Sequence, residues 1–464
     1  MSFMNHKLLL VVTVVLLSTG SALAQTPAKP EVTPTPNVSA TPDTRAAKIL
    51  FDEVNTYVDK RFAEFNKQKV PYSVQLDTKV KQEKKDLAAK YAANLQARSS
   101  LSDAESYYLG MLNHFAGNGD AAFAAMRRYL ASEPTGGIDA QFARAVVVLY
   151  ATRKNLTPEA ERAVEAFAKH EPKNLLEWFG METLITEAWK ASKDFEKMLK
   201  HAQEMQKISR LIAADKKVDP FKRDDLLFKS VSLMAEALTQ LNKKDAAIAE
   251  VVELRKLAVA IPSGNLLRYA NIRLMGLDRT LDPRSAFDDV PATATDLPDI
   301  VASQWIDQAP VKLSALRGQV VLLDFWAHWC GPCRYTFPRL QRWHEAYKDK
   351  GLVILGVTNY FGHVEGRKVT PAEELAYLRT FKKTNRLPYG FAVADTGIND
   401  MNYGVFSIPM SFLIDREGKV RYIATGVNEQ DLAALDKRIR KLFEESSAPT
   451  AATIESQGVK NNQD

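Results

Sequence analysis

Residues 325–340 read FWAHWCGPCRYTFPRL and contain both cysteines of a chain of 464 residues. Only Gly331 and Pro332 separate Cys330 from Cys333, so the two thiols are near enough to pair with each other. A purely structural disulfide is a poor explanation, because closing so short a loop stabilises a fold very little. The spacing instead predicts a redox-active dithiol that exchanges with other disulfides.

Strand-like and helical patterns alternate around this dithiol. Residues 319–327, QVVLLDFWA, are mostly apolar and predict a buried central strand, and residues 351–359, GLVILGVTN, predict a second one. A helix is expected between them at 335–348. The other predicted strands are 301–305, 311–313, 389–393, 410–415 and 420–425, the helices are 371–384, 398–403 and 429–443, and a turn lies at 416–419. This order predicts an α/β sandwich with a mixed sheet.

The order of strand, WCGPC, helix, strand, helix, strand, Ile-Pro, hairpin and helix resembles the thioredoxin fold. The additional helix and strand within 371–393 resemble the TlpA/ResA type of that fold. The resemblance covers 299–444 and rests on VVLLDFWAHWCGPC (320–333), Pro338 and FSIPMSFLIDREGKV (406–420). It implies an extracytoplasmic thiol-disulfide oxidoreductase, usually a reductant, that needs no cofactor beyond its own redox-active disulfide.

Each cysteine is given its own role by its place relative to the helix. Cys330 is expected at the helix N-terminus, where free backbone N–H groups and the helix dipole favour a thiolate. It is therefore predicted to be the attacking nucleophile. Cys333 is one turn further in and is predicted to resolve the mixed disulfide before it dissociates. Pro332 is tolerated in the first turn, because its missing N–H would have had no partner there.

Asp324 stands six residues before Cys330, at the position that matches the buried acid of thioredoxin. Burial of a carboxylate is expensive, so desolvation should raise its pKa. We expect Asp324 to accept the proton of Cys333, through water, and to return it later. The alternative is an exposed aspartate at the end of a strand. TlpA-like proteins often carry asparagine at this position, which leaves the base assignment open.

The Ile408–Pro409 pair matches the cis-proline loop of the family, which faces the disulfide. The resemblance implies a cis peptide bond at this position. A proline here leaves the backbone of Ile408 free to pair with an extended substrate, as in strand addition. Ile408 and Pro409 are therefore predicted to bind substrate.

Residues next to the cysteines are expected to complete the substrate site. Trp329, Gly331 and Pro332 are the candidates, because they flank the attacking thiol. Trp326 is better explained by core packing. His328 occupies a position that varies in the family and faces solvent, so it is given no role as a base.

Residues 45–275 follow amphipathic helical patterns almost throughout. The stretches AMRRYLASEP (125–134) and AVEAFAKHEP (163–172) are similar, and residues 107–130 predict two helices around a Gly-Asn-Gly-Asp turn. This layout resembles a tetratricopeptide unit, although the strict period of about 34 residues is not kept. We predict a degenerate array of helical hairpins. Its surface either binds a partner or peptide, or belongs to a bundle whose apolar stripes only pack on each other.

The N-terminal residues predict export. Residues 1–24 combine a positive charge, an apolar run at 8–17 and small residues before a cleavage site after Ala24. The run is about half of the ~20 residues that a membrane-spanning helix needs, so a cleaved signal peptide and a soluble, periplasmic product are expected. Residues 25–44 are rich in proline and threonine and predict a spacer, as do residues 276–298. Residues 445–464 lose apolar periodicity and predict a disordered tail.

Composition argues against two other classes of protein. The chain has 62 Lys and Arg against 56 Asp and Glu, a formal net charge of +6, and no cluster dense enough for nucleic-acid binding. Two cysteines cannot close a four-ligand zinc site, so no metal is expected. The expected partners are proteins with disulfides and, by resemblance, a membrane electron donor of the DsbD or CcdA type.

The sequence therefore favours a reductase of protein disulfides whose helical region positions its partners. The Gly-Pro pair between the cysteines matches thioredoxin, whose potential is roughly −270 mV, whereas the oxidase DsbA lies near −120 mV. An oxidase or isomerase remains an alternative, as does a helical scaffold or binding protein that senses redox state. A peroxidase is a weaker possibility, because no Thr-x-x-Cys pattern is present.

Overall fold

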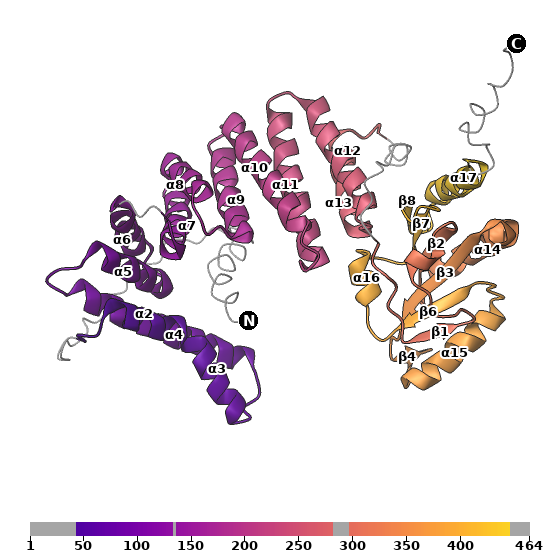
Figure 1. Cartoon of the computed structure of the whole chain (residues 1–464), viewed down its shortest axis with the longest axis horizontal. Helices are drawn as coiled ribbons and strands as arrows, with labels where there is room; N and C mark the ends of the chain where they lie inside the picture. Colours follow the sequence, from indigo (N-terminus) through magenta and orange to yellow (C-terminus); the bar gives the residue numbers. More distant parts are fainter. Residues whose placement is uncertain (1–42, 133–135, 282–296, 446–464) are drawn as a thin grey trace, which may run out of the picture. The chain divides into compact units, whose positions relative to one another are not determined.

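The computed structural model describes residues 43–132, 136–281 and 297–445 (Figure 1). Within these ranges the chain divides into two compact units, one up to Ala214 and one from Asp215 onward. The predicted fold class is confirmed, since helices precede a thioredoxin-like α/β sandwich. The predicted signal peptide, most of the 25–44 spacer, residues 282–296 and the tail after residue 445 lie outside the described residues.

The first unit is built from helices that pack in consecutive pairs. Its helices are α2 (Ala47–Asn55), α3 (Tyr57–Lys67), α4 (Val74–Gln96), α5 (Asp103–Ala116), α6 (Gly119–Ala131), α7 (Ile138–Arg153), α8 (Thr157–Lys169), α9 (Leu175–Ala191) and α10 (Phe195–Ala213). Helix α5 packs on α6, α7 on α8 and α9 on α10. No helix in the described part of the chain combines the length and apolar character needed to cross a membrane.

The helical hairpin predicted at 107–130 is present as α5 and α6. A capping box between Ser102 and Glu105 begins α5. The helix ends at Gly117, whose φ of +80° is left-handed, a conformation that glycine adopts without steric cost. Helix α6 begins two residues later. The likeness of this region to tetratricopeptide repeats stays a prediction.

The second unit contains a mixed sheet whose centre is the strand before the dithiol. Among the described residues the strand order is β1–β6–β3–β2–β7–β8. The strands are β1 (Gln304–Ile306), β2 (Val320–Phe325), β3 (Leu352–Asn359), β6 (Gly390–Ala394), β7 (Met410–Ile414) and β8 (Val420–Thr425). Strand β2 is parallel to β3 and antiparallel to β7, and all its residues are buried. This burial on both faces is what its apolar run predicted.

The second unit also contains helices that precede, separate and follow these strands along the chain. They are α11 (Pro220–Gln240), α12 (Lys244–Ala260), α13 (Gly264–Leu277), α14 (Gly331–Tyr347), α15 (Pro371–Thr384), α16 (Ile398–Asn402) and α17 (Glu429–Glu445). Helices α12 and α17 pack on β8. At the turn from α12 to α13, the N–H of Gly264 donates to the carbonyl of Tyr403 at 3.0 Å. A Cβ added at Gly264 would come within 2.3 Å of the sulfur of Met410, so the turn lies directly against the sheet.

The strand predicted at 311–313 is wrong. The chain forms a 3₁₀ helix, η3 (Leu313–Leu316), instead. The N–H of Leu313 donates to the carboxylate of Asp299 at 2.9 Å, and this bond turns the backbone away from an extended course. The local apolar pattern predicted a strand, but this contact with a side chain distant in the sequence favours another conformation.

The strand predicted at 301–305 begins later than expected. Both backbone groups of Val301 are bound by the side-chain amide of Asn399, at 2.9 and 2.7 Å, so they do not enter the sheet ladder. Pairing with β6 therefore starts at Gln304.

A short hairpin between β3 and α15 was not predicted. It consists of β4 (His363–Val364) and β5 (Arg367–Lys368). Its turn residues Glu365 and Gly366 have φ of +49° and +80°, the positive values that a two-residue hairpin turn requires. Glu-Gly is a weaker turn signal than Asn-Gly, and strands of two residues leave no alternation to detect.

Candidate active site

The two cysteines lie where the central strand has ended and helix α14 begins. Strand β2 ends at Phe325, and Cys330 caps the N-terminus of α14. Cys330 and Cys333 form a disulfide, with their Cα atoms 5.3 Å apart. The backbone N–H of Cys333 donates to the Cys330 sulfur at 3.1 Å. An amide of the first helical turn therefore points at the sulfur that was predicted to carry negative charge.

The predicted loop opposite the disulfide is confirmed. The carbonyl oxygen of Ile408 lies 3.9 Å from the Cys330 sulfur, and the Ile408–Pro409 peptide bond is cis. Cys330 keeps 4% of its surface exposed, whereas Cys333 keeps none. A reagent from solvent therefore meets Cys330 first.

Asp324 has no exposed surface, as predicted. Burial raises the pKa of Asp324 to about 7, and a hydrogen bond that the Ser411 hydroxyl donates to Oδ1 at 2.8 Å opposes this rise. The sheet register places these residues opposite each other on β2 and β7. Among the described residues, the second oxygen Oδ2 has no hydrogen-bond partner. A carboxyl group with one unbonded oxygen and a pKa near neutrality can accept and return a proton.

The predicted substrate-contact residues beside the two cysteines are exposed. Trp329 is 52% exposed, and Gly331 and Pro332 are also exposed at the start of α14. The N–H of Ile408 makes no hydrogen bond within the described residues, so this backbone edge is open. Trp326 is buried in the core, which confirms its structural interpretation.

His328 is buried, so the expectation that it faces solvent is wrong. Only 2% of its surface is exposed, and its ring packs against the rings of Phe361 and Tyr377. Its Nε2 lies 3.4 Å from Oε1 of Glu374. Burial lowers the pKa of His328, and the Glu374 carboxylate opposes that shift. The loop at Phe361 and helix α15 cover this position, which a strand-turn-helix pattern alone leaves open.

Glu374 is the site residue that the sequence did not reveal. Its side chain is fully buried and accepts backbone N–H groups from Phe361 and Gly362, both at 2.9 Å. Thr370 and Glu373 already form the capping box of α15. In the sequence, Glu374 is therefore explained simply as a second acidic residue that stabilises the start of the helix. Its burial depends on the preceding loop folding back over the helix, for which no local signal exists.

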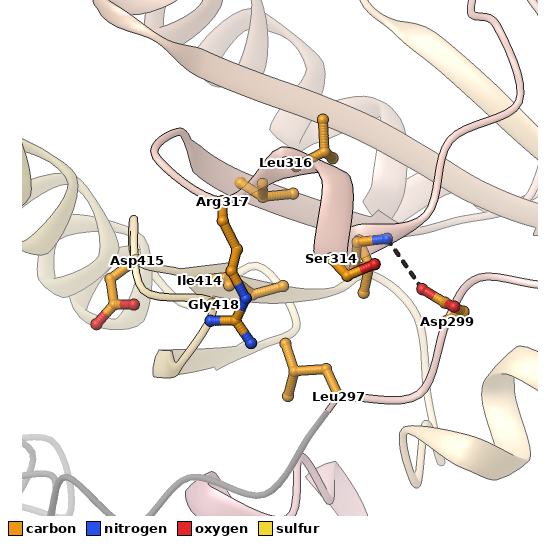
Figure 2. Close-up of a pocket in the computed structure, with 10 residues that line it drawn as sticks. Leu297, Asp299, Ser314, Leu316, Arg317, Ile414, Asp415 and Gly418 are labelled. Carbon is orange, nitrogen blue, oxygen red and sulfur yellow. Dashed lines mark hydrogen bonds between the residues drawn. The ribbon is translucent and has the colours of Figure 1, made fainter.

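A cavity of about 180 Å³ lies elsewhere in the same unit (Figure 2). Val321 and Ile414, which line it, pair near the start of β2. Phe325 and Met410 pair at the opposite end of the same two strands, where the chain leads into the dithiol. This cavity is therefore not part of the dithiol site. Within the described ranges, no group of three or more His, Cys, Asp or Glu side chains is placed to hold a metal ion.

Comparison with known proteins finds relatives of this domain. A family model described as the AhpC/TSA family matches residues 293–423. Protein DipZ of Mycobacterium tuberculosis is 32% identical over 160 residues, which are 33% of this chain and 21% of DipZ. The thiol-disulfide oxidoreductase ResA of Bacillus thuringiensis subsp. konkukian is 30% identical over 132 residues, which are 28% of this chain and 68% of ResA.

A solved structure described as a thiol:disulfide interchange protein DsbE, from Chlorobium tepidum, is 33% identical, with a TM-score of 0.27. The match covers 32% of this chain and 95% of that one. The chain spans about a fifth of the length of DipZ but two thirds of ResA. Through its α/β domain, the chain belongs to the ResA family of thioredoxin-like thiol-disulfide oxidoreductases.

Proposed function

We propose that this chain is an exported enzyme that reduces disulfide bonds in protein substrates with the Cys330–Cys333 dithiol. The observation that carries the proposal is the geometry at the start of α14, where the Cys333 amide donates to the Cys330 sulfur and the Ile408 carbonyl lies opposite. A helix N-terminus that solvates this sulfur favours its thiolate, which is the reactive form. The names of the curated relatives support the same reaction class.

The reaction follows from these positions. In the reduced enzyme the Cys330 thiolate attacks one sulfur of the substrate disulfide, and the other substrate sulfur leaves as a thiolate and takes up a proton. Cys333 then loses its proton and attacks Cys330, which releases the second substrate thiol and forms the Cys330–Cys333 disulfide. Two electrons pass from the enzyme to the substrate. The state with Cys330 joined to Cys333 is the product of this half-reaction.

Asp324 is proposed to take the proton that Cys333 must lose. Its pKa of about 7 lets it gain or release a proton near neutral pH. Its unbonded Oδ2 is available for this exchange. Since Asp324 is fully buried, water is the expected carrier between the carboxyl group and the sulfur.

Substrate binding is proposed along the edge formed by Ile408 and Pro409. The open N–H and carbonyl of Ile408 can pair with an extended segment, while Trp329, Gly331 and Pro332 contact its side chains. Pairing of this kind recognises the backbone of the substrate rather than its side chains. It therefore suits an enzyme that acts on many disulfide-bearing segments.

The setting of the reaction is proposed from the sequence. The N-terminal signal pattern supports export to the periplasm, and the helical region is proposed to position protein partners. An exported reductant must regain electrons across a membrane, so a donor of the DsbD or CcdA type is proposed. The Gly331–Pro332 pair supports a strongly reducing couple. A midpoint potential near −270 mV would fit a reductase, and one above about −150 mV would make the protein an oxidase.

The proposal is tested by trapping. Cys333→Ser removes the resolving thiol, so we expect a stable mixed disulfide between Cys330 and its substrates in native extracts, identified by mass spectrometry. Cys330→Ser, the matched control, should trap far less, because the remaining thiol is fully buried. Wild type should reduce a protein disulfide such as that of insulin, and both variants should not. Equal trapping by the two variants, or partner binding that follows redox state without turnover, would favour the redox-sensing scaffold.

A further inference from the structure

The exposed face of helix α14 carries a shallow groove that is open to solvent and begins one residue after the dithiol. The groove has a volume of about 1070 Å³, and its lining begins with Arg334, the residue after Cys333. Tyr335, Arg339 and Arg342 continue it along the helix. Tyr335 is 54% exposed. The groove is therefore accessible, and it begins at the residue that follows the dithiol in the sequence.

The charges along this groove do not balance. Arg339 pairs with Glu429, and Glu345, an acidic residue of the lining, pairs with Lys348 at 2.9 Å. Arg334 donates to the backbone carbonyl of His328 at 2.9 Å, and no ion pair joins it to a carboxylate within the described residues. Two guanidinium groups therefore remain without neutralising charge, which makes the groove attractive to anions.

The second of these guanidinium groups is Arg342. It is exposed, and it has neither a hydrogen bond nor an ion pair to any described residue. It also lines a neighbouring hollow of about 470 Å³, where Asp436 is already bound by Trp343 and Arg440. Acidic residues of the protein itself are thus committed to other partners, and Arg342 is available to an outside carboxylate.

Glu429 shows how this surface holds a carboxylate. Its two oxygens accept hydrogen bonds from the Tyr335 hydroxyl and from the Arg339 guanidinium, although Glu429 lies on a different helix, α17. A guanidinium beside a phenol is a geometry that recognises carboxylates well. Arg342 lies on the same face of α14, about one turn beyond Arg339, and pairs with no carboxylate of the described residues.

We propose that the Arg334–Arg342 face of α14 is a docking groove for an acidic segment of the protein substrate, adjoining the disulfide that the enzyme reduces. The proposal rests on the proposed function and names the class of substrate. Carboxylates of the substrate would pair with Arg342 and Arg334, while its disulfide reaches Cys330. Exposed pairs of this kind are individually weak and screened by salt, so their effect should be seen in KM and should fall with ionic strength.

The test uses the full-length protein and three cyclic disulfide peptides that share one ring and differ only in a glutamate-rich, glutamine-rich or lysine-rich flank. At low ionic strength we expect wild type to show a KM for the glutamate-rich peptide about three- to tenfold below that for the glutamine-rich one. Arg342→Glu should abolish this preference, and Arg342→Gln should reduce it. The kcat and the midpoint potential should stay unchanged in both, because Arg342 touches neither cysteine.

Arg379→Glu is the matched control, since Arg379 is exposed on α15 outside the groove and the substitution changes net charge equally. It should keep the wild-type preference, and salt at about 1 M should remove the preference from every variant. Equal KM values for the three peptides with wild type, or equal losses in the two charge-reversed variants, would overturn the docking groove. If wild type reduces none of the peptides, including the glutamine-rich one, the proposed reductase function fails instead.

Discussion

Asp324 carries its carboxyl group on the central strand with no exposed surface. Its pKa of about 7 in the folded protein compares with about 3.9 in an unfolded chain. Between these values the folded state binds more protons than the unfolded state, so the free energy of unfolding falls as pH rises from about 4 to about 7. This difference between the folded and unfolded pKa values corresponds to a loss of about 4 kcal/mol in the free energy of unfolding, which is complete above pH 7.

Asp324→Asn should remove this loss. The amide keeps the shape and still accepts from the Ser411 hydroxyl, but it never ionises. We expect the oxidised variant to be about 2–4 kcal/mol more stable than wild type at pH 8 and nearly equal at pH 4. Urea unfolding of both proteins at the two pH values measures this. The same stability difference at both pH values would show that the pKa of Asp324 is not raised in the folded protein.

His328 and Glu374 place a second pair of ionisable groups near the dithiol. His328 lies two residues before Cys330, and Glu374 reaches it from α15. The histidine pKa is lowered by burial, so the folded protein resists its protonation. As pH falls below the ordinary value of about 6.5, the unfolded state gains this proton first, and stability declines. Asp324 and His328 therefore act in opposite directions, and their effects on stability oppose each other in the pH range where both titrate.

The turn between α12 and α13 shows how a helical element is tied to the sheet. Gly264 donates to the carbonyl of Tyr403 and lies against the Met410 side chain, while Arg268 of α13 stacks over the ring of Phe406. Met410 is the residue after Pro409. The strand that follows the Ile408–Pro409 loop is therefore supported by residues far away in sequence.

Gly264→Ala should destabilise the protein. Its Cβ would overlap the sulfur of Met410 and lie 3.1 Å from the carbonyl of Gly404, so the buried Met410 side chain or the turn must shift. Overpacking of this kind costs about 1–3 kcal/mol, measurable by chemical denaturation. Gly276→Ala in the same helix is the control, because no atom lies within 4 Å of its Cβ, and it should be neutral or slightly stabilising. Equal effects at both positions would contradict close docking of this turn.

At the scale of the molecule, the described chain from Asp215 onward is one compact unit. The linker predicted at 276–298 follows α13. The boundary between the two compact units, after Ala214, therefore lies at a different place from the change in sequence pattern. The contacts of Gly264 and α12 with the sheet explain the difference. Helices that follow a bundle-like pattern here cover part of the α/β core.

A fragment of residues 215–445 should therefore be more stable than one of residues 297–445. Without α11–α13, the side chain of Met410 and the neighbouring part of β8 lose their cover. Burial of one such side chain is worth about 1.5–3 kcal/mol, which corresponds to a melting temperature lower by about 4–10 °C for a fragment of this size. Calorimetry of both fragments measures the shift. Equal melting temperatures would mean that the helices add no stabilising contact.

Much of the fold and the site could be read from the chain alone. The buried strand 320–325 and the burial of Asp324 follow from a continuous apolar run, which depends only on neighbours within a few positions. The cis-proline loop at Pro409 follows from the resemblance to the thioredoxin fold. The failures at 311–313 and at His328 come from contacts that reach across many residues.

The sequence by itself determined that a dithiol stands at a helix start, above a buried acid and within an alternating α/β order. The tertiary structure alone decided what surrounds it: the burial of His328 by α15, the pairing with Glu374, the support of Met410 by Gly264 and the unpaired charge at Arg342. The physical reason is that amphipathic patterns specify which face of an element is buried but not which partner buries it. Charge balance and exposure depend on that partner, and they appear only when the chain is folded.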